Sequence, residues 1–172
     1  TYSVSTRPEN HLGTKLLDMH LDHVVGMNLI GAEMAFLMGS FSIQGEYVIN
    51  SVDALQVYDD YTFSGYYGQV SYFLTGEKRK YKNSLAGFDR VKPINNMKEG
   101  EGWGALELAA RYSSMDLSEA HEGVLNDITI GLNWYLNPCT RVMFNYVMGT
   151  LEEDHGEETI ENTFQCRMQI DF

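Results

Sequence analysis

Apolar and polar residues alternate along the C-terminal end of the chain, over residues 160–172. A period of two is typical of a strand with one apolar and one polar face. The apolar face of this predicted strand consists of Phe164, Cys166, Met168, Ile170 and Phe172. In a soluble sandwich that face would pack against a second sheet. In a transmembrane barrel it would contact lipid, and the polar face would line water.

The same alternation predicts six more long strands and one partial strand. The long strands are expected at residues 27–38, 41–49, 62–74, 106–113, 127–136 and 141–151. The partial strand is expected at residues 1–6, before Arg7 and Pro8 end the pattern. Residues 11–26 lack a clean period, so we expect a long surface loop there.

The predicted connections alternate between short turns and long loops. Short turns are expected at residues 39–40 and 137–140, and long acidic loops at 51–61 and 152–158. Outer-membrane barrels alternate their connections in this way, and strands of about nine to eleven residues can cross a bilayer at a tilt. The pattern therefore predicts an all-β fold, namely an antiparallel transmembrane β-barrel with about seven or eight strands in this chain.

The composition agrees with this interpretation and argues against other classes. A length of 172 residues suits one domain, 1–172. No stretch approaches the roughly 18 consecutive apolar residues of a membrane helix, whereas eleven Tyr, eight Phe and sixteen Gly are typical of strands and barrel interfaces. A formal net charge of −12 argues against nucleic acid as a partner.

Positive charge is concentrated in one segment, residues 75–101, which we expect to form a long loop within the barrel domain. It holds seven of the twelve basic residues. These are Lys78, Arg79, Lys80, Lys82, Arg90, Lys92 and Lys98. Loops of this length are usually functional or disordered.

Three further arginines, Arg111, Arg141 and Arg167, are expected on the polar faces of neighbouring strands. A ladder of guanidinium groups would guide phosphate through bidentate contacts. Alternatively, Glu107 and Asp127 would pair with these arginines, which would then only fill the wall. Both interpretations stay open on spacing.

The sequence does not suggest an enzyme, a metal site or a cofactor. No Ser, His and acid constellation recurs. His20, Asp22 and His23 lie close together, but on an irregular segment they are more often plain surface residues than metal ligands. Cys139 and Cys166 are expected about 20 Å apart by strand rise, which is beyond disulfide reach, so we predict that both are free.

Several long blocks of the sequence closely resemble the C-terminal half of phosphate-selective porins of the O/P family. The blocks are residues 63–77, 88–93, 102–114, 130–138 and 144–147, and the resemblance runs from about residue 41 to residue 172. It implies that the chain is roughly the second half of a sixteen-stranded, trimeric barrel of the Gram-negative bacterial outer membrane, with basic residues along a narrow anion path. It also implies that Phe172 is the closing aromatic residue that the barrel assembly machinery recognises. The acidic net charge and the missing N-terminal strands depart from the family pattern.

With the C-terminus on the periplasmic side, strand parity places residues 75–101 on that side as well, where turns are normally short. The segment would then either fold into the lumen and hold its basic residues near passing anions, or form a solvated excursion or a trimer contact. We therefore predict an outer-membrane porin for passive diffusion of small solutes, with anions such as phosphate favoured. The alternative is a non-conducting small outer-membrane barrel that acts as an anchor or adhesin.

Overall fold

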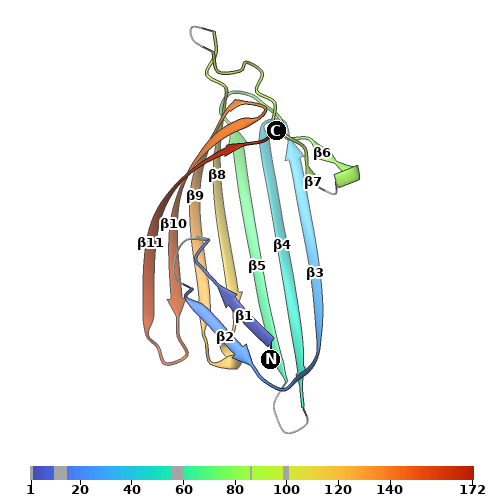
Figure 1. Ribbon diagram of the computed structural model, residues 1–172, viewed down its shortest axis with the longest axis vertical. Coiled ribbons are helices and arrows are strands. Elements are labelled where there is room, and N and C mark those ends of the chain that lie inside the picture. Colours follow the sequence, from blue (N-terminus) through green and yellow to red (C-terminus); the bar gives the residue numbers. More distant parts are fainter. Residues whose placement is uncertain (1, 10–14, 56–59, 86, 99–100) are drawn as a thin grey trace.

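The computed structural model of the chain describes residues 2–9, 15–55, 60–85, 87–98 and 101–172. Seven long antiparallel strands form one sheet, in the order β11-β10-β9-β8-β5-β4-β3 (Figure 1). Their bounds are β3 (Val24–Met38), β4 (Phe41–Ala54), β5 (Tyr61–Phe73), β8 (Ala105–Asp116), β9 (Val124–Asn137), β10 (Thr140–Glu152) and β11 (Glu158–Ile170). The seven long strands predicted from the alternation are confirmed. No helix in the described part of the chain is long and apolar enough to cross a membrane.

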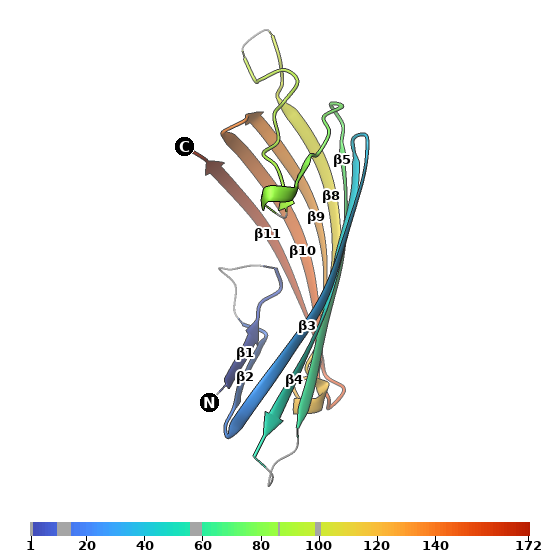
Figure 2. The ribbon, with the colours of Figure 1, turned by 90° about the vertical axis from the view of Figure 1, so that its right-hand side faces the viewer.

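The sheet is strongly curved and open, with β3 and β11 at its two edges (Figure 2). Side chains alternate along each strand, so one set points outward from the convex face of the sheet and the other set points inward from the concave face. Large apolar side chains crowd the convex face, where Ile30 is 71% exposed and Phe164 is 69% exposed. Exposed apolar surface of this extent marks a region made for contact with lipid or protein.

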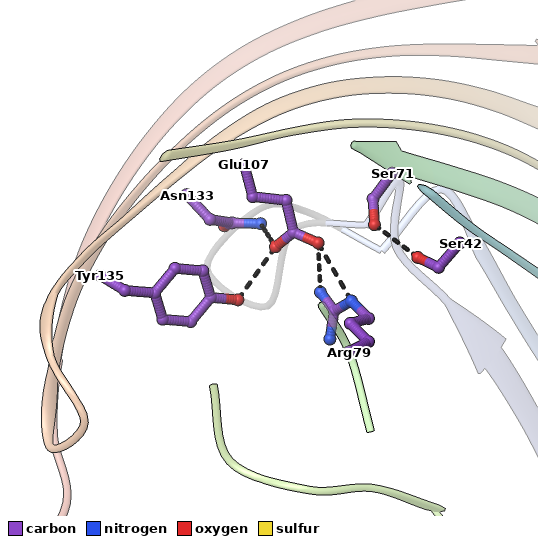
Figure 3. Close-up of polar contacts among 6 residues, drawn as sticks. All are labelled: Ser42, Ser71, Arg79, Glu107, Asn133 and Tyr135. Carbon is purple, nitrogen blue, oxygen red and sulfur yellow. Dashed lines mark hydrogen bonds and ion pairs between the residues drawn. The ribbon is translucent and has the colours of Figure 1, made fainter. Parts of the chain in front are cut away.

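The concave face is polar over much of its length. Ser42 of β4 and Ser71 of β5 are opposite each other in the ladder, and their hydroxyl oxygens lie 2.7 Å apart. Both side chains are buried and point into the curve of the sheet (Figure 3). This hydrogen bond satisfies two polar groups that would otherwise be costly to bury.

Most strand ends differ from the prediction by a few residues, and the ends of β4 and β11 differ in ways that matter here. Strand β4 continues to Ala54, so the predicted loop at 51–61 begins too early; Asp53 lies within the strand, and Asp59 lies outside the described residues. Strand β11 ends at Ile170, so Phe172 follows the strand and does not belong to it. The end is set by the turn opposite, where the N–H of Asp171 donates to the carbonyl of Cys139 at 2.8 Å. Cys139 and Cys166 are both free and exposed.

The prediction of a surface loop at residues 11–26 is wrong. Strand β2 (Leu17–Leu21) pairs with β1 (Tyr2–Thr6) in a separate two-stranded hairpin, and β3 begins at Val24. Residues 10–14 lie outside the described part. The partial strand at the N-terminus therefore exists, but it is not an eighth strand of the curved sheet.

The β1–β2 hairpin lies against the concave face (Figure 2). Leu17, Met19 and Leu21 of β2 are buried in one apolar cluster with residues of the wall. The wall contributes Val52, Phe63, Leu117, Leu125 and Leu151. A second cluster of Phe73, Val91, Ala105 and Tyr135 lies toward the other end of the sheet. Each cluster buries apolar side chains beneath a segment that folds over the wall.

Candidate functional site

The basic segment, residues 75–101, folds back over the concave face (Figure 2). In the described part of this segment, residues 75–85, 87–98 and 101, the helices and strands are short, namely β6 (Tyr81–Lys82), the 3₁₀ turn η1 (Asn83–Leu85) and β7 (Gly87–Phe88). Val91 packs in the second apolar cluster, and the N–H of Met97 donates to the carbonyl of Leu136 at 2.7 Å. The segment is therefore bound to the inside of the wall over much of its length.

Glu107 on β8 accepts from four donors, two on Arg79 of this segment and two on β9 of the wall (Figure 3). Its Oε1 accepts hydrogen bonds from Nε and Nη2 of Arg79 at 3.0 and 2.5 Å. Its Oε2 accepts from Asn133 Nδ2 at 3.1 Å and from the Tyr135 hydroxyl at 2.9 Å. Glu107 is 0% exposed. A buried carboxylate is tolerated only when its charge is paired and its oxygens are satisfied, and these contacts meet both conditions.

The hypothesis that Glu107 pairs with Arg111, Arg141 or Arg167 is therefore wrong. The register places Glu107 opposite Phe73 and Asn133, at the level where the basic segment crosses the wall. Arg79 is consequently neutralised by Glu107, and its guanidinium carbon lies 5.7 Å from the centre of the Phe73 ring. Its charge is used in attachment to the wall.

A second carboxylate fixes the start of the segment. Glu77 is buried, and its Oε1 accepts a hydrogen bond from the N–H of Ile94 at 3.0 Å. Its Oε2 accepts from the Thr75 hydroxyl, whose oxygen accepts in turn from the N–H of Leu106 at 3.0 Å. These contacts tie two distant points of the segment to each other and to β8.

Four predicted basic residues come together on this segment. A hollow of about 280 Å³ is lined by Lys78, Lys80, Arg90 and Lys92, together with the carboxylates of Glu77 and Asp89. All four basic side chains are exposed. Cations grouped around an open hollow raise the local concentration of anions. Lys82 is exposed on β6 outside this hollow, and Lys98 pairs with Glu101 at 2.8 Å.

Arg111 lies on the concave face of β8 and pairs with an acid from the N-terminal segment. Its Nε is 2.5 Å from Oε1 of Glu9, and its guanidinium carbon lies 3.8 Å from the centre of the Tyr67 ring. The Ser113 hydroxyl donates to Glu9 Oε1 at 2.8 Å, and the Thr129 hydroxyl donates to Oε2 at 3.0 Å. Sequence reasoning missed Glu9, because no local pattern links residue 9 to β8.

Arg141 and Arg167 also lie on the concave face, on β10 and β11. Arg141 donates from Nε and Nη2 to Gln169 Oε1 at 3.2 and 2.8 Å. Arg167 is exposed. It lies at the same level of the sheet as Glu107, because Arg167 is the Cα partner of Met143, Met143 of Asn133, and Asn133 of Glu107. The three arginines thus occupy different levels of one polar face and are not stacked in direct contact. Asp127 forms no ion pair with any of them among the described residues.

Comparison with known proteins agrees with these features. The model of the family described as phosphate-selective porin O and P matches residues 1–172. Porin O of Pseudomonas aeruginosa is 35% identical over 159 residues, which are 83% of this chain and 34% of that protein. An uncharacterized protein of Caulobacter vibrioides is 35% identical over 120 residues, 64% of this chain and 23% of that protein. The chain thus spans about a third or less of these relatives, and it belongs to the phosphate-selective porin O and P family.

Proposed function

We propose that the complete protein is an outer-membrane porin through which small anions, phosphate among them, diffuse passively along the concave face. The observation that carries this proposal is the contrast between the two faces of the sheet. The convex face presents apolar side chains suited to lipid, and the concave face carries Arg111, Arg141 and Arg167. Guanidinium groups bind oxyanions with paired donors, so each of these arginines provides a weak binding site for phosphate along the concave face.

The acidic net charge does not oppose anion passage in this proposal, because charge is distributed unevenly. The basic hollow lies at the end of the sheet where β5 ends and β8 begins. The acidic run Glu152–Glu158 joins β10 to β11 at the opposite end. An anion on the path meets the local charge of the hollow and the arginines, because more distant surface charges are screened by salt.

The proposal also includes partners and orientation. Lipid covers the convex face, three copies assemble into a trimer, and the exposed ring of Phe172 is the signal for the barrel assembly machinery. The short turns and the basic segment lie on the periplasmic side. Each of these statements rests on the family and on the two-faced sheet.

Anion preference can be measured as the reversal potential of the complete protein in a planar bilayer under a potassium chloride gradient. We expect anion selectivity in the native protein. Changing Lys78, Lys80, Arg90 and Lys92 together to glutamine should shift the reversal potential toward cations, because the hollow loses its positive charge. Lys98→Gln is the control, since Lys98 is an exposed residue paired with Glu101. Cation selectivity of the native protein would refute anion passage, and absence of current would favour the non-conducting alternative.

The lipid-facing side can be tested with the two native cysteines in nanodiscs. Cys139 lies in the turn between β9 and β10, whereas Cys166 lies in the middle of β11 among convex apolar residues. We expect a charged maleimide to label Cys139 readily and Cys166 at least tenfold more slowly, because lipid excludes the charged reagent from the strand. Both should react after unfolding in detergent and urea. Equal labelling of both thiols in nanodiscs would contradict a lipid-covered convex face.

A further inference from the structure

The Glu9 carboxylate occupies a set of donors that belong to the wall of the sheet. Arg111 supplies a guanidinium group, and Ser113 and Thr129 supply hydroxyl groups to both carboxylate oxygens. Arg111 and Thr129 are Cα partners across β8 and β9, so a rigid ladder fixes these two donors. Glu9 itself adopts a positive φ of 40°, a conformation that residues other than glycine rarely adopt.

One guanidinium group and two hydroxyl groups, fixed on adjacent strands, form a donor set for an oxyanion of any origin. We propose that Arg111, Ser113 and Thr129 form an oxyanion-binding site in which the Glu9 carboxylate is a tethered competitor. A passing anion binds there when it displaces Glu9. This inference rests on the proposed anion passage. It adds the position of one anion-binding site and names the Glu9 carboxylate as the group that occupies it in the absence of a ligand.

The segment that carries Glu9 also covers a buried acceptor. Asp127 of β9 is 5% exposed, and its Oδ1 has no hydrogen-bond partner among the described residues. Asp127 is the Cα partner of both Ser113 and Gly149. A Cβ atom at position 149 would lie 2.7 Å from Pro8 Cβ and 2.8 Å from Asp127 Oδ1. Glycine at this position therefore leaves room for both Pro8 and Asp127. Moving Pro8 and Glu9 away uncovers the donors and Asp127 together.

There is room for a ligand at this place. Arg7, Glu9, Arg111, Ser113 and Asp127 line a common hollow of about 700 Å³ on the concave face. A small tetrahedral anion fills a small part of that volume. The ligand would therefore replace the Glu9 carboxylate without movement of the wall strands.

The unpartnered oxygen of Asp127 defines the class of anion. A buried acceptor without a donor is costly, so a ligand that brings a hydrogen gains relative to one that does not. Hydrogen phosphate carries a hydroxyl group that donates to Asp127 Oδ1 while its other oxygens accept from Arg111, Ser113 and Thr129. Sulfate and chloride carry no hydrogen. The site thus favours oxyanions that bear a hydroxyl group.

The test is binding of inorganic phosphate to the complete protein in detergent, measured by isothermal titration calorimetry. Glu9→Gln preserves the size of the side chain and removes the competing charge. We expect phosphate to bind about tenfold more tightly to Glu9→Gln, in line with the loss of one charge-assisted contact. Glu33→Gln is the matched control, because it removes the same charge from the concave side of β3 with no contact to Arg111, and it should leave phosphate affinity unchanged.

Two further variants identify the site itself. Adding Ser113→Ala and Thr129→Ala to Glu9→Gln should abolish the gain in affinity, because the hydroxyl donors are lost. Asp127→Asn removes the negative charge and replaces one carboxylate oxygen with an amide N–H donor, so it should raise the affinity for sulfate relative to phosphate by about tenfold. If Glu9→Gln binds phosphate no more tightly than the native protein, the tethered-competitor proposal is overturned. Cation selectivity in the bilayer measurement would instead overturn the proposed function, because binding and selectivity are measured separately.

Discussion

Replacing Glu107 with alanine is expected to release the basic segment from the concave face. The substitution leaves Arg79, Asn133 and Tyr135 without their shared acceptor. Tyr135 is buried, and Arg79 and Asn133 are half-buried. Removing one partner of a buried ion pair typically costs about 3–5 kcal/mol, because the remaining charge is uncompensated. The guanidinium group of Arg79 is only partly exposed on the wall and becomes fully hydrated when the segment moves away from it. The expected result is a detached segment on a sheet that otherwise persists.

Trypsin can report this detachment, since Lys78, Arg79, Lys80 and Lys82 are cleavage sites within the segment. We expect cleavage in this region of the folded Glu107→Ala protein to be at least tenfold faster than in the native protein. Glu107→Gln should be intermediate, because it retains an acceptor oxygen for one of the neighbours. Glu101→Ala is the control, since Glu101 forms an exposed pair with Lys98 that contributes little. Equal cleavage rates for Glu107→Ala and Glu101→Ala would show that Glu107 does not hold the segment.

The curved sheet was predictable because alternation is a local property. Successive side chains of β9 and β11 point alternately to the convex and the concave face. The alternation of apolar and polar residues along each strand therefore shows directly which residues lie on which face. The predicted faces also agree, with Phe164 on the convex face and Arg167 opposite Met143 on the concave face. Strand ends were less accurate, because β4 extends past Ile49 through pairing with β5 that no single strand reveals.

The hairpin was missed although its signal is present. Residues 17–21 read Leu-Asp-Met-His-Leu, and the alternation matches the observed burial at every position. The run is only five residues long and is flanked by irregular sequence, so the surrounding pattern conceals it. Its partner strand β1 and the wall that it covers are both separate in the sequence, and only the folded chain brings them together.

The electrostatic partners were not predictable for a related reason. Arg79 and Glu9 reach the wall because two connecting segments fold over the concave face. The spacing along β8 predicts that Glu107 and Arg111 lie on the polar face of the strand. It does not predict which segment of the chain covers that face and contacts them. As a result the faces of Glu107 and Arg111 were expected from the sequence, and the pairing of Glu107 with Arg79 and of Arg111 with Glu9 was not.

A buried charge in the β1–β2 hairpin is expected to open the concave side of the complete protein. Leu17 is 1% exposed and packs in the apolar cluster that joins β2 to the wall. Each fully buried side chain of this kind contributes about 1.5–3 kcal/mol, so Leu17, Met19 and Leu21 account for much of the attachment. An ionised carboxylate at position 17 would lack a partner in this cluster, and its desolvation costs several kcal/mol. Detachment of the hairpin is therefore the lower-energy outcome for Leu17→Asp.

His20→Asp separates this effect from the added charge itself. His20 lies on the same strand, but its side chain is exposed on the opposite face, so an acid there remains in water. If the concave face lines the water-filled path proposed above, single-channel conductance in a planar bilayer should rise by about half or more for Leu17→Asp, because a detached hairpin would no longer narrow that path, whose conductance grows with its open cross-section. It should change little for His20→Asp. If both variants conduct equally, the hairpin does not limit the path, and the narrowest point must be made by other parts of the protein such as the basic segment.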